Sequence, residues 1–428
     1  MQNVELPFLR KNHMKKEEEK FYRELNKYIC QNENSDNIYY QFGYEAFGII
    51  LYGFSKWLIK NLKKENIKDV FFLSRDGYIM KKAFELLPES KEFKTNYLYV
   101  SRRSLRVPSI WFSEKRKKET IFPTKYISIN DLIMSIGLNA DNYQDVIQEC
   151  GLQPEQIIKE DQVENKYEVM KLLDEIWDDV LDNSIEEYNN LREYLVQFNM
   201  PENIAIVDIG WRGSMQFFLR KILEKMGKGI NIKGYYITLS TSHLKGMDMY
   251  GYLQDVDGYS KGCDLLRGYV GLIEMMFLMS EGSVQRYKKL NGKVIPILED
   301  YEYANSKEYA DRVMHIQQGA IDFIKGIECE NSLKDMSFTS EAAFTYLNEV
   351  GNHPTMDDIN RFGDFPFFNN GTVSLLVQTD NLTEYIKNPK KAKQDLYKSR
   401  WRIGFLRQLF KINLPYYTLF KIMMKAAM

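Results

Sequence analysis

The segment Asp208–Ser214, which reads Asp-Ile-Gly-Trp-Arg-Gly-Ser, constrains the fold more than any other part of this 428-residue chain. It follows the apolar run Ile204–Val207 and precedes Met215–Leu223, whose apolar residues recur at helical spacing. This order predicts a strand, a tight glycine-containing turn and a helix. Backbone N–H groups of such a turn and the positive end of the helix can hold a phosphate, while the Asp208 carboxylate can bind sugar hydroxyls or a hydrated cation. The alternative is a plain strand-to-helix turn with Ser214 as the N-cap.

Two other apolar runs also end in charged residues. Val70–Leu73 is followed by Ser-Arg-Asp-Gly-Tyr at 74–78, and Tyr97–Val100 is followed by Ser-Arg-Arg-Ser at 101–104. The first run is apolar at every position, as expected for a strand buried on both faces. Alone, its Arg-Asp pair is equally well interpreted as a solvated ion pair at a helix start, which contributes about 0–1 kcal/mol.

If the three strands are neighbours in one parallel sheet, the residues that follow them meet in a single cleft, where open α/β sheets bind their ligands. This cleft would hold four arginines and two aspartates, a combination that predicts a polyphosphate site with a divalent metal ion, Mg²⁺ or Mn²⁺. Neither the dinucleotide-binding glycine fingerprint nor the Walker phosphate loop occurs in the chain. The predicted site consists of Ser74, Arg75, Asp76, Gly77, Tyr78, Ser101, Arg102, Arg103, Asp208, Gly210, Trp211, Arg212, Gly213 and Ser214.

The pattern as a whole predicts an α/β protein with a doubly wound, mainly parallel, Rossmann-like sheet, a helical insertion and a helical C-terminal region. The predicted parts are an arm and helix (1–36), the α/β core (37–112 and 200–290), the insertion (113–199), a mostly helical lobe (291–389) and a basic tail (390–428). Finer expectations are helices at Lys15–Cys30, Tyr167–Phe198, 303–327 and 339–350, strands at Gly234–Ser240 and Val294–Ile297, and Asn130 as a helix N-cap.

Composition limits the classes of protein that the chain can belong to. Charged residues make up 27% and hydrophobic residues 44% of the chain, as in ordinary globular proteins. The four cysteines and four histidines are scattered without metal-ligand spacing, which predicts a reduced, cytoplasmic protein without a zinc site. The longest apolar stretch, Ala46–Ile59, is too short to span a bilayer, and the N-terminus lacks the pattern of a signal peptide.

The net charge of −1 hides an uneven distribution of charge. Residues 141–187 contain 15 Asp and Glu against three Lys, which favours a solvated outer face, whereas residues 390–428 contain ten Lys and Arg and one Asp. Lys398–Lys411 interleaves basic and large apolar residues at helical spacing, a pattern typical of helices on membrane surfaces. The alternative is a helix packed on the core or on a dimer partner. Nucleic-acid binding is not expected, because the rest of the chain is not basic.

Several motifs resemble the glycan phosphoribosyltransferase domain of bacterial dual-domain ribofuranosyltransferases. They are FFLSRDGYIMKKAF at Phe71–Phe84, YLYVSRRSL at Tyr97–Leu105 and IAIVDIGWRGSMQ at Ile204–Gln216, with further similarity at Tyr39–Gly48 and Gly271–Ser283. The likeness therefore spans roughly residues 37 to 290.

The resemblance implies a glycosyltransferase that moves a 5-phosphoribofuranosyl group from phosphoribosyl pyrophosphate (PRPP) to a hydroxyl of a lipid-linked surface glycan, such as O-antigen or capsule, and releases pyrophosphate. The enzyme would work at the cytoplasmic face of the inner membrane, held there by residues 390–428. The roles that it implies are ribose and metal binding for Asp208, 5-phosphate binding for the 211–214 turn, and pyrophosphate binding for Arg75, Arg102 and Arg103. Asp76 would be the base and Glu274 the alternative. A buried ion pair is an equally valid interpretation of Glu274, which stands in an apolar run.

Two rival functions remain: a phosphatase of the haloacid-dehalogenase type, and a non-catalytic, membrane-docked factor for polysaccharide assembly. In the family a phosphatase domain often precedes the transferase domain. Its Asp-x-Asp pair is absent from residues 1–36, and neither Asp76 nor Asp208 supplies it. A separate phosphatase would therefore have to remove the 5-phosphate from the product.

Overall fold

The computed structural model describes residues 8, 19–114, 126–159, 165–240, 246–253, 266–330, 333–334, 336–369 and 372–426. Most of the predicted N-terminal arm, and the first residues of the predicted Lys15–Cys30 helix, lie outside this description. The remainder of that helix is present as α1 (Glu19–Asn32).

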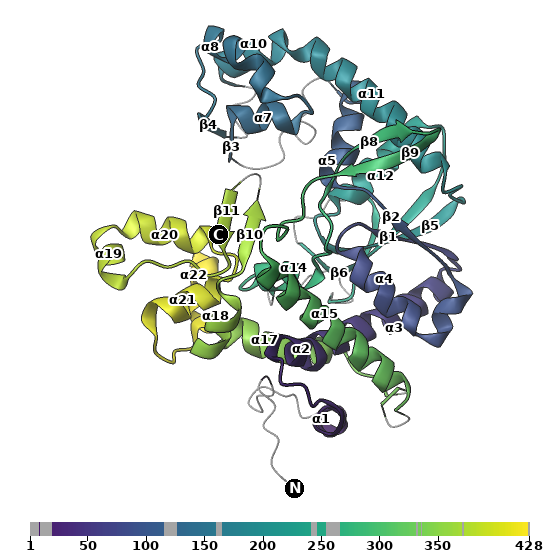
Figure 1. The fold of residues 1–428 in the computed structure, drawn as a ribbon, viewed down its shortest axis with the longest axis vertical. Coiled ribbons are helices and arrows are strands. Elements are labelled where there is room, and N and C mark those ends of the chain that lie inside the picture. Colours follow the sequence, from purple (N-terminus) through teal and green to yellow (C-terminus); the bar gives the residue numbers. More distant parts are fainter. Residues whose placement is uncertain are drawn as a thin grey trace.

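A five-stranded, entirely parallel sheet forms the centre of the molecule, with the strand order β2–β1–β5–β6–β7 (Figure 1). The strands are β1 (Asp69–Leu73), β2 (Lys94–Leu98), β5 (Asn203–Trp211), β6 (Asn231–Leu239) and β7 (Asp248–Gly251). From β1 the chain moves to β2 on one side, and it later returns to β5 on the other side. The topological switch point of the sheet therefore lies between β1 and β5, and the predicted doubly wound α/β fold is confirmed.

Both faces of the sheet are covered, because successive residues of β1 enter different hydrophobic cores. Val70 and Phe72 pack on one face, whereas Phe71 and Leu73 pack on the other. The first face is covered by α3 (Gly48–Lys64), α4 (Gly77–Leu86) and α15 (Lys307–Glu328), and the second by α11 (Trp177–Val196), α12 (Ser214–Lys225) and the hairpin of β8 (Val284–Leu290) and β9 (Lys293–Leu298). This double coverage is the reason why β1 is apolar at every buried position.

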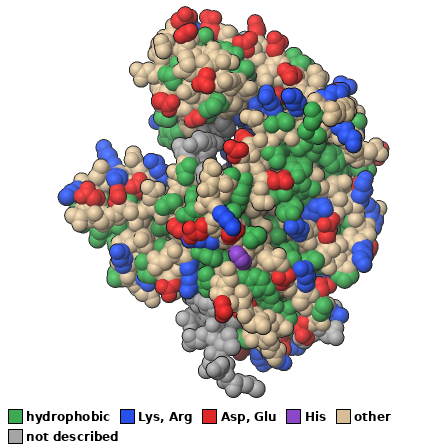
Figure 2. Space-filling view, in the orientation of Figure 1, with side chains coloured by type: hydrophobic (Ala, Val, Ile, Leu, Met, Phe, Trp, Pro, Cys, Tyr) green, Lys and Arg blue, Asp and Glu red, His purple; other side chains and the backbone are tan. Residues whose placement is uncertain are grey.

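The insertion forms a lobe with its own hydrophobic core, drawn at the top of Figure 1 and joined to the sheet by α11. Its elements are β3 (Tyr126–Ser128), α7 (Ile129–Ser135), α8 (Gln144–Glu149), β4 (Ile157–Lys159) and α10 (Tyr167–Glu175), with 3₁₀ turns at Val107–Phe112 and Ala140–Tyr143. The purely helical prediction was wrong here, because β3 and β4 pair antiparallel. The N-cap is Ser128 rather than Asn130, since its hydroxyl accepts from the Asp131 N–H at 3.0 Å. Acidic side chains gather on this lobe, as predicted (Figure 2).

The N-terminal and C-terminal helices share one continuous core with the first face of the sheet. The N-terminal and core elements are α2 (Ile38–Phe42), a π-helix (Gly43–Phe47), a 3₁₀ turn (Pro88–Glu92), α5 (Arg102–Arg106) and α14 (Val270–Phe277). The C-terminal elements are α16 (Ser340–Ala343), α17 (Thr345–Asn352), α18 (Met356–Phe362), β10 (Pro366–Asn369), β11 (Thr372–Leu375), α19 (Leu382–Lys387), α20 (Pro389–Lys398), α21 (Arg402–Phe410) and α22 (Tyr416–Ala426). The helices predicted near 303–327 and 339–350 are therefore present, as are the two finer strand predictions.

Part of the basic tail packs into this core. Trp401 is fully buried and donates its indole N–H to the Gly351 carbonyl at 2.8 Å, and Ile403 and Phe405 are buried beside it. The core-packing alternative therefore holds for α21. In the part of the chain that the structure describes, no helix is both long enough and apolar enough to cross a membrane.

Candidate functional site

Three carboxylates gather beside the switch point between β1 and β5. Asp76 follows the end of β1, Asp208 lies near the end of β5, and Glu274 is in α14. Asp208 is buried, whereas Asp76 and Glu274 keep partial access to solvent although protein atoms surround them. We call these three residues the carboxylate cluster. The fold thus brings together the residues that the sequence predicted as catalytic.

Asp76 holds a proton more tightly than an ordinary carboxylic acid. Burial raises the pKa of Asp76 to about 8, and the charges of Asp208 and Glu274 add to the rise. Arg75 and Arg102 oppose it. A carboxyl group that titrates near neutral pH is suited to accept a proton from a substrate hydroxyl.

The other two carboxylates are also shifted. Burial raises the pKa of Asp208 to about 6, and the backbone N–H groups of the next two residues, with Arg102, limit the rise. Its Oδ1 atom is buried without a hydrogen-bond partner. Burial raises the pKa of Glu274, which Arg400 and Arg102 lower in turn. The indole N–H of Trp211 also lowers this pKa, but it falls short of a regular hydrogen bond and is better described as directed toward the carboxylate.

Two of the four predicted arginines lie close to the carboxylate cluster. Arg75 forms an ion pair with Glu302, which precedes α15. Arg102, at the start of α5, acts electrostatically on all three carboxylates. It is exposed and forms no hydrogen bond or ion pair with the described residues. Arg102 is therefore available to an incoming phosphate, whereas Arg75 must first leave Glu302.

The other two predicted arginines differ from each other. Arg103 donates hydrogen bonds to both carboxylate oxygens of Glu187 in α11, at 3.0 and 2.9 Å, and another to the Gln285 carbonyl. Its guanidinium is thus already bound by the protein, and its role in pyrophosphate binding stays a prediction. Arg212 is exposed and forms no ion pair with the described residues.

The turn after β5 has an unusual backbone. The φ angles are 122° at Gly210, 77° at Trp211 and 73° at Gly213. Because a bulky residue rarely adopts a positive φ, Trp211 is held in place by its surroundings. A Cβ on Gly210 would lie 2.1 Å from the carbonyl oxygen of Thr238, so this position requires glycine.

Gly213 rather than Ser214 is the N-cap of α12, so the alternative interpretation of Ser214 as the cap is wrong. The hydroxyl of Ser214 forms no hydrogen bond with the described residues. The first N–H groups of α12 remain without helical partners, as at any helix start. Together these donors form an arrangement that favours an anion.

The remaining predicted residues shape the site. The Ser74 hydroxyl donates to the Val100 carbonyl at 2.7 Å and accepts from its N–H at 3.0 Å, which ties the ends of β1 and β2 together. Ser101 is the N-cap of α5, within a capping box. Gly77 and Tyr78 begin α4.

Sequence reasoning missed residues that reach the site from distant parts of the chain. Glu302 pairs with Arg75 across 227 positions, and Glu187 pairs with Arg103 across 84 positions. Arg400 lies near Glu274 although it belongs to the C-terminal tail. None of these residues stands in a motif. Glu187 and Arg400 lay in segments that their charge had singled out, the acidic 141–187 and the basic 390–428, whereas Glu302 did not.

The site fits a magnesium or manganese ion that is shared with a phosphate. The unpartnered Oδ1 atom of Asp208 is a suitable oxygen ligand. Among the described residues, no group of three or more His, Cys, Asp or Glu could hold a metal ion by itself. Mg²⁺ usually takes only one or two carboxylates and completes its shell with water and substrate phosphates. Asp208 is therefore the residue that would hold the ion.

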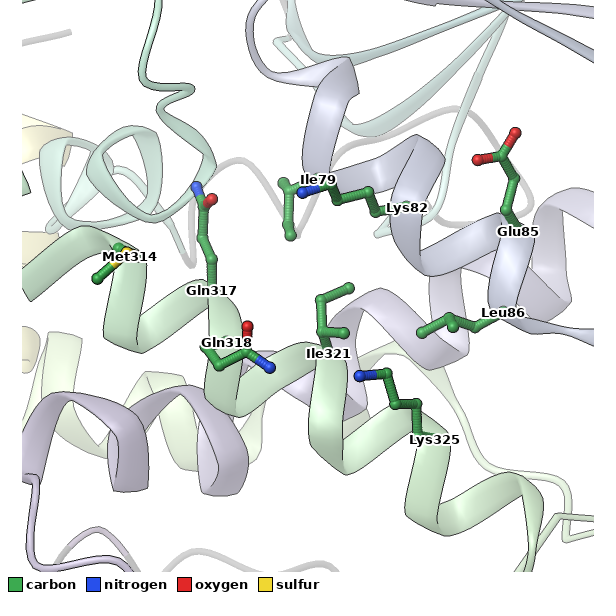
Figure 3. A pocket seen from close by; sticks show the side chains of 9 residues that line it. All are labelled: Ile79, Lys82, Glu85, Leu86, Met314, Gln317, Gln318, Ile321 and Lys325. Atoms are coloured by element: carbon green, nitrogen blue, oxygen red, sulfur yellow. The ribbon is translucent and has the colours of Figure 1, made fainter. Parts of the chain in front are cut away.

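A separate groove of about 460 Å³ lies between α4 and α15 (Figure 3). Side chains of both helices, among them Lys82, Gln317 and Lys325, point toward it. None of the predicted site residues lines this groove, so it is distinct from the carboxylate cluster.

Comparison with known proteins adds no family to this description. The chain matches no protein-family model, and no curated protein matches it at a significant level.

Proposed function

We propose that this protein is a PRPP-dependent glycan phosphoribosyltransferase, which transfers a 5-phosphoribofuranosyl group to a hydroxyl of a bacterial surface glycan. The observation that carries the proposal is the position of the carboxylate cluster beside Arg102 and Arg75 at the switch point of a parallel sheet. The reaction needs acids that stabilise a sugar cation and accept a proton, together with cations that stabilise a diphosphate leaving group. Both kinds of group are present at one place.

In this reaction the bond between the anomeric carbon and the pyrophosphate oxygen breaks, and a bond to the acceptor oxygen forms. The acceptor proton passes to a base, for which we assign Asp76 because of its raised pKa. Glu274 is the alternative base. Asp208 would face the ribose, where its negative charge stabilises the positive charge that develops on the sugar ring.

The phosphate groups of the donor would be held by the surrounding cations and N–H groups. Arg102 and Arg75 would bind the pyrophosphate, and the turn at 211–214 with the start of α12 would bind the 5-phosphate. A magnesium or manganese ion held by Asp208 would neutralise charge on the departing pyrophosphate.

The proposal includes a location and two partners. The acceptor would be a lipid-linked glycan at the cytoplasmic face of the inner membrane, and a separate phosphatase would remove the 5-phosphate. Exposed apolar residues near the C-terminus favour a peripheral attachment: Phe410, Ile412, Leu414, Leu419 and Ile422 are 41, 56, 41, 41 and 60% exposed. Lys411 and Lys421 are exposed among them, and this mixture suits an anionic membrane surface.

Titration calorimetry with PRPP and Mg²⁺ tests the donor assignment. We expect the wild type to bind, and Asp208→Asn and Arg102→Ala each to weaken binding tenfold or more, which corresponds to about 1.4 kcal/mol. Arg192→Ala is the matched control, because it removes an exposed positive charge from α11.

Two results would contradict the proposal. If the wild type binds a nucleotide sugar but not PRPP, the donor assignment fails. If PRPP binds but no acceptor glycan is altered and no pyrophosphate is released across many acceptors, the assembly-factor interpretation is favoured instead.

A further inference from the structure

Two arginines of the C-terminal tail, Arg400 and Arg402, flank Trp401, and Arg400 lies near Glu274 of the carboxylate cluster. Ser399 and Trp401 are buried in the core, whereas Arg400 and Arg402 are partly exposed. Both arginines thus keep access to solvent beside residues that are turned into the core.

Backbone hydrogen bonds to Gly268 and to the first turn of α14 hold the segment of these arginines in place. The Gly271 N–H donates to the Arg400 carbonyl at 3.0 Å, and the Ile403 N–H donates to the Gly268 carbonyl at 3.3 Å. A Cβ on Gly271 would lie 2.4 Å from the Cβ of Arg400, which shows how closely the two segments approach. Arg267, which precedes Gly268, lies near Arg402.

Neither Arg400 nor Arg402 forms an ion pair with the described residues, although Arg400 lies near Glu274. The buried Nε atom of Arg402 has no hydrogen-bond partner. Both guanidinium groups contact aromatic rings: Arg400 lies 4.4 Å from the Phe367 ring centre, and Arg402 lies 5.9 Å from that of Tyr397. Burial lowers the pKa of Arg402, and the positive charges of Arg400 and Arg267 lower it further. The neighbouring, partly buried guanidinium groups of Arg400 and Arg402 repel each other, and a bound anion would relieve this repulsion.

The proposed donor site does not use these cations. Arg102 and Arg75 stand at the strand ends, whereas Arg400 and Arg402 come from the tail, and Glu274 is close to both Arg102 and Arg400. Guanidinium groups bind phosphate oxygens through paired N–H donors. We propose that Arg400 and Arg402 form a second anion-binding site, which takes a phosphate or diphosphate group carried by the acceptor. That the acceptor supplies this group rests on the proposed transfer reaction, whereas the anion site itself does not.

Calorimetry at constant ionic strength tests this site, with a water-soluble short-chain prenyl diphosphate and inorganic pyrophosphate as probes and with the protein first saturated with PRPP and Mg²⁺. We expect the wild type to bind the prenyl diphosphate. The double variant Arg400→Gln/Arg402→Gln should bind it at least tenfold more weakly, while its affinity for PRPP changes less than twofold. Glutamine keeps part of the side chain over the aromatic rings, and thermal unfolding of each single variant checks that the fold is retained. Lys393→Gln/Lys398→Gln is the matched control, because it removes two exposed positive charges from α20.

The outcomes separate the two proposals. If the double variant loses affinity for PRPP and for the prenyl diphosphate equally, the arginines belong to the donor site and the second site is overturned. Equal loss of prenyl diphosphate affinity in the lysine control would overturn it as well. If PRPP does not bind at all, but diphosphate binding still requires Arg400 and Arg402, the anion site stands and the proposed function fails. Preference for the prenyl ester over inorganic pyrophosphate supports a lipid-linked ligand, whereas equal affinity supports the site with a free diphosphate as its ligand.

Discussion

Asp76 follows β1 and Asp208 lies near the end of the neighbouring parallel strand β5, so their carboxyl groups share one buried site and compete for ionisation. Because the pKa of such a buried carboxyl group differs between the folded and unfolded protein, the stability of the fold depends on pH. The folded protein keeps a proton on Asp76 at pH values where the unfolded chain has lost it. Buried carboxylates that serve a reaction commonly lower the stability of the fold in this way.

The stability of the Asp76→Asn variant should reveal this proton. The pKa of Asp76 is about 8 in the folded protein, against an ordinary value of 3.8. The stabilisation from the protonated group is therefore fully present below about pH 4 and is lost as the pH rises through 8. Asp76→Asn should match the wild type at about pH 4 and be several kcal/mol more stable than it at pH 8.5, because each tenfold change in proton affinity corresponds to about 1.4 kcal/mol. Urea denaturation at both pH values measures the difference.

The exposed Asp141→Asn is the control, and its stability relative to the wild type should not change with pH. If the difference in the free energy of unfolding between Asp76→Asn and the wild type is the same at both pH values, the raised pKa of Asp76 is refuted.

The ion pair between Arg75 and Glu302 predicts competition with the donor. Because the Glu302 carboxylate occupies the guanidinium that a phosphate would use, Glu302→Gln should release Arg75 and strengthen PRPP binding about three- to tenfold, or roughly 0.7–1.4 kcal/mol. Calorimetry measures this change. Glu281→Gln is the control and should have a smaller effect, because the Glu281 carboxylate accepts a hydrogen bond from Tyr99 and forms no ion pair with Arg75. Unchanged or weaker binding in Glu302→Gln would show that Glu302 supports the site rather than competes for it.

At the scale of elements, α21 and the preceding Trp401 pack the start of the basic tail against the core. The tail alternates basic and apolar residues, which is also the pattern of a membrane-surface helix. Trp401 is fully buried in the core, and its N–H bond to Gly351 satisfies the indole there. The aromatic side of this segment therefore contributes to folding and is not free to enter a lipid surface.

Replacing this anchor should destabilise the protein. Trp401→Ala removes a large buried side chain and leaves a cavity, for which we expect a loss of about 3–5 kcal/mol. Phe410→Ala, at the exposed end of the same helix, should change stability by less than about 0.5 kcal/mol. Urea denaturation compares the two variants. Equal, small losses would mean that the tail is not part of the folding unit.

At the scale of the whole molecule, three lobes contribute to one site. Asp76 comes from the turn after β1 and Asp208 from β5, Glu187 of α11 in the insertion holds Arg103, and Glu302, before α15, pairs with Arg75. The end of the tail combines exposed apolar residues with lysines, and this is the surface that we expect to meet the membrane.

Vesicle binding tests this surface. The double variant Leu419→Asp/Ile422→Asp should bind anionic lipid vesicles at least tenfold more weakly than the wild type, because it loses apolar contact and gains repulsion from the lipid charge. Ile157→Asp, at an equally exposed position of the insertion lobe, should bind as the wild type does. Sedimentation with vesicles measures both. Equal binding by all three proteins would exclude this part of the tail as the anchor.

Local sequence patterns account for four of the five strands of the central sheet, and β7 was not predicted. The apolar runs before Arg75 and Arg102 and before Asp208 predicted three strands, and all three are neighbours in the sheet. The same patterns did not predict the β3–β4 pair, and they placed the N-cap of α7 at Asn130 instead of Ser128. Short strands of three residues carry too little periodicity to be recognised.

The sequence alone determined which residues follow the buried strands, since hydrophobic runs and turn residues are local properties of the chain. On this basis it identified Asp76, Asp208 and Arg102. Only the tertiary structure decided which charges remain available there. It pairs Arg103 with Glu187, and it places Arg400 beside Glu274. These pairings join positions far apart in the chain, and no local pattern encodes them, because they depend on how the lobes pack around the switch point of the sheet.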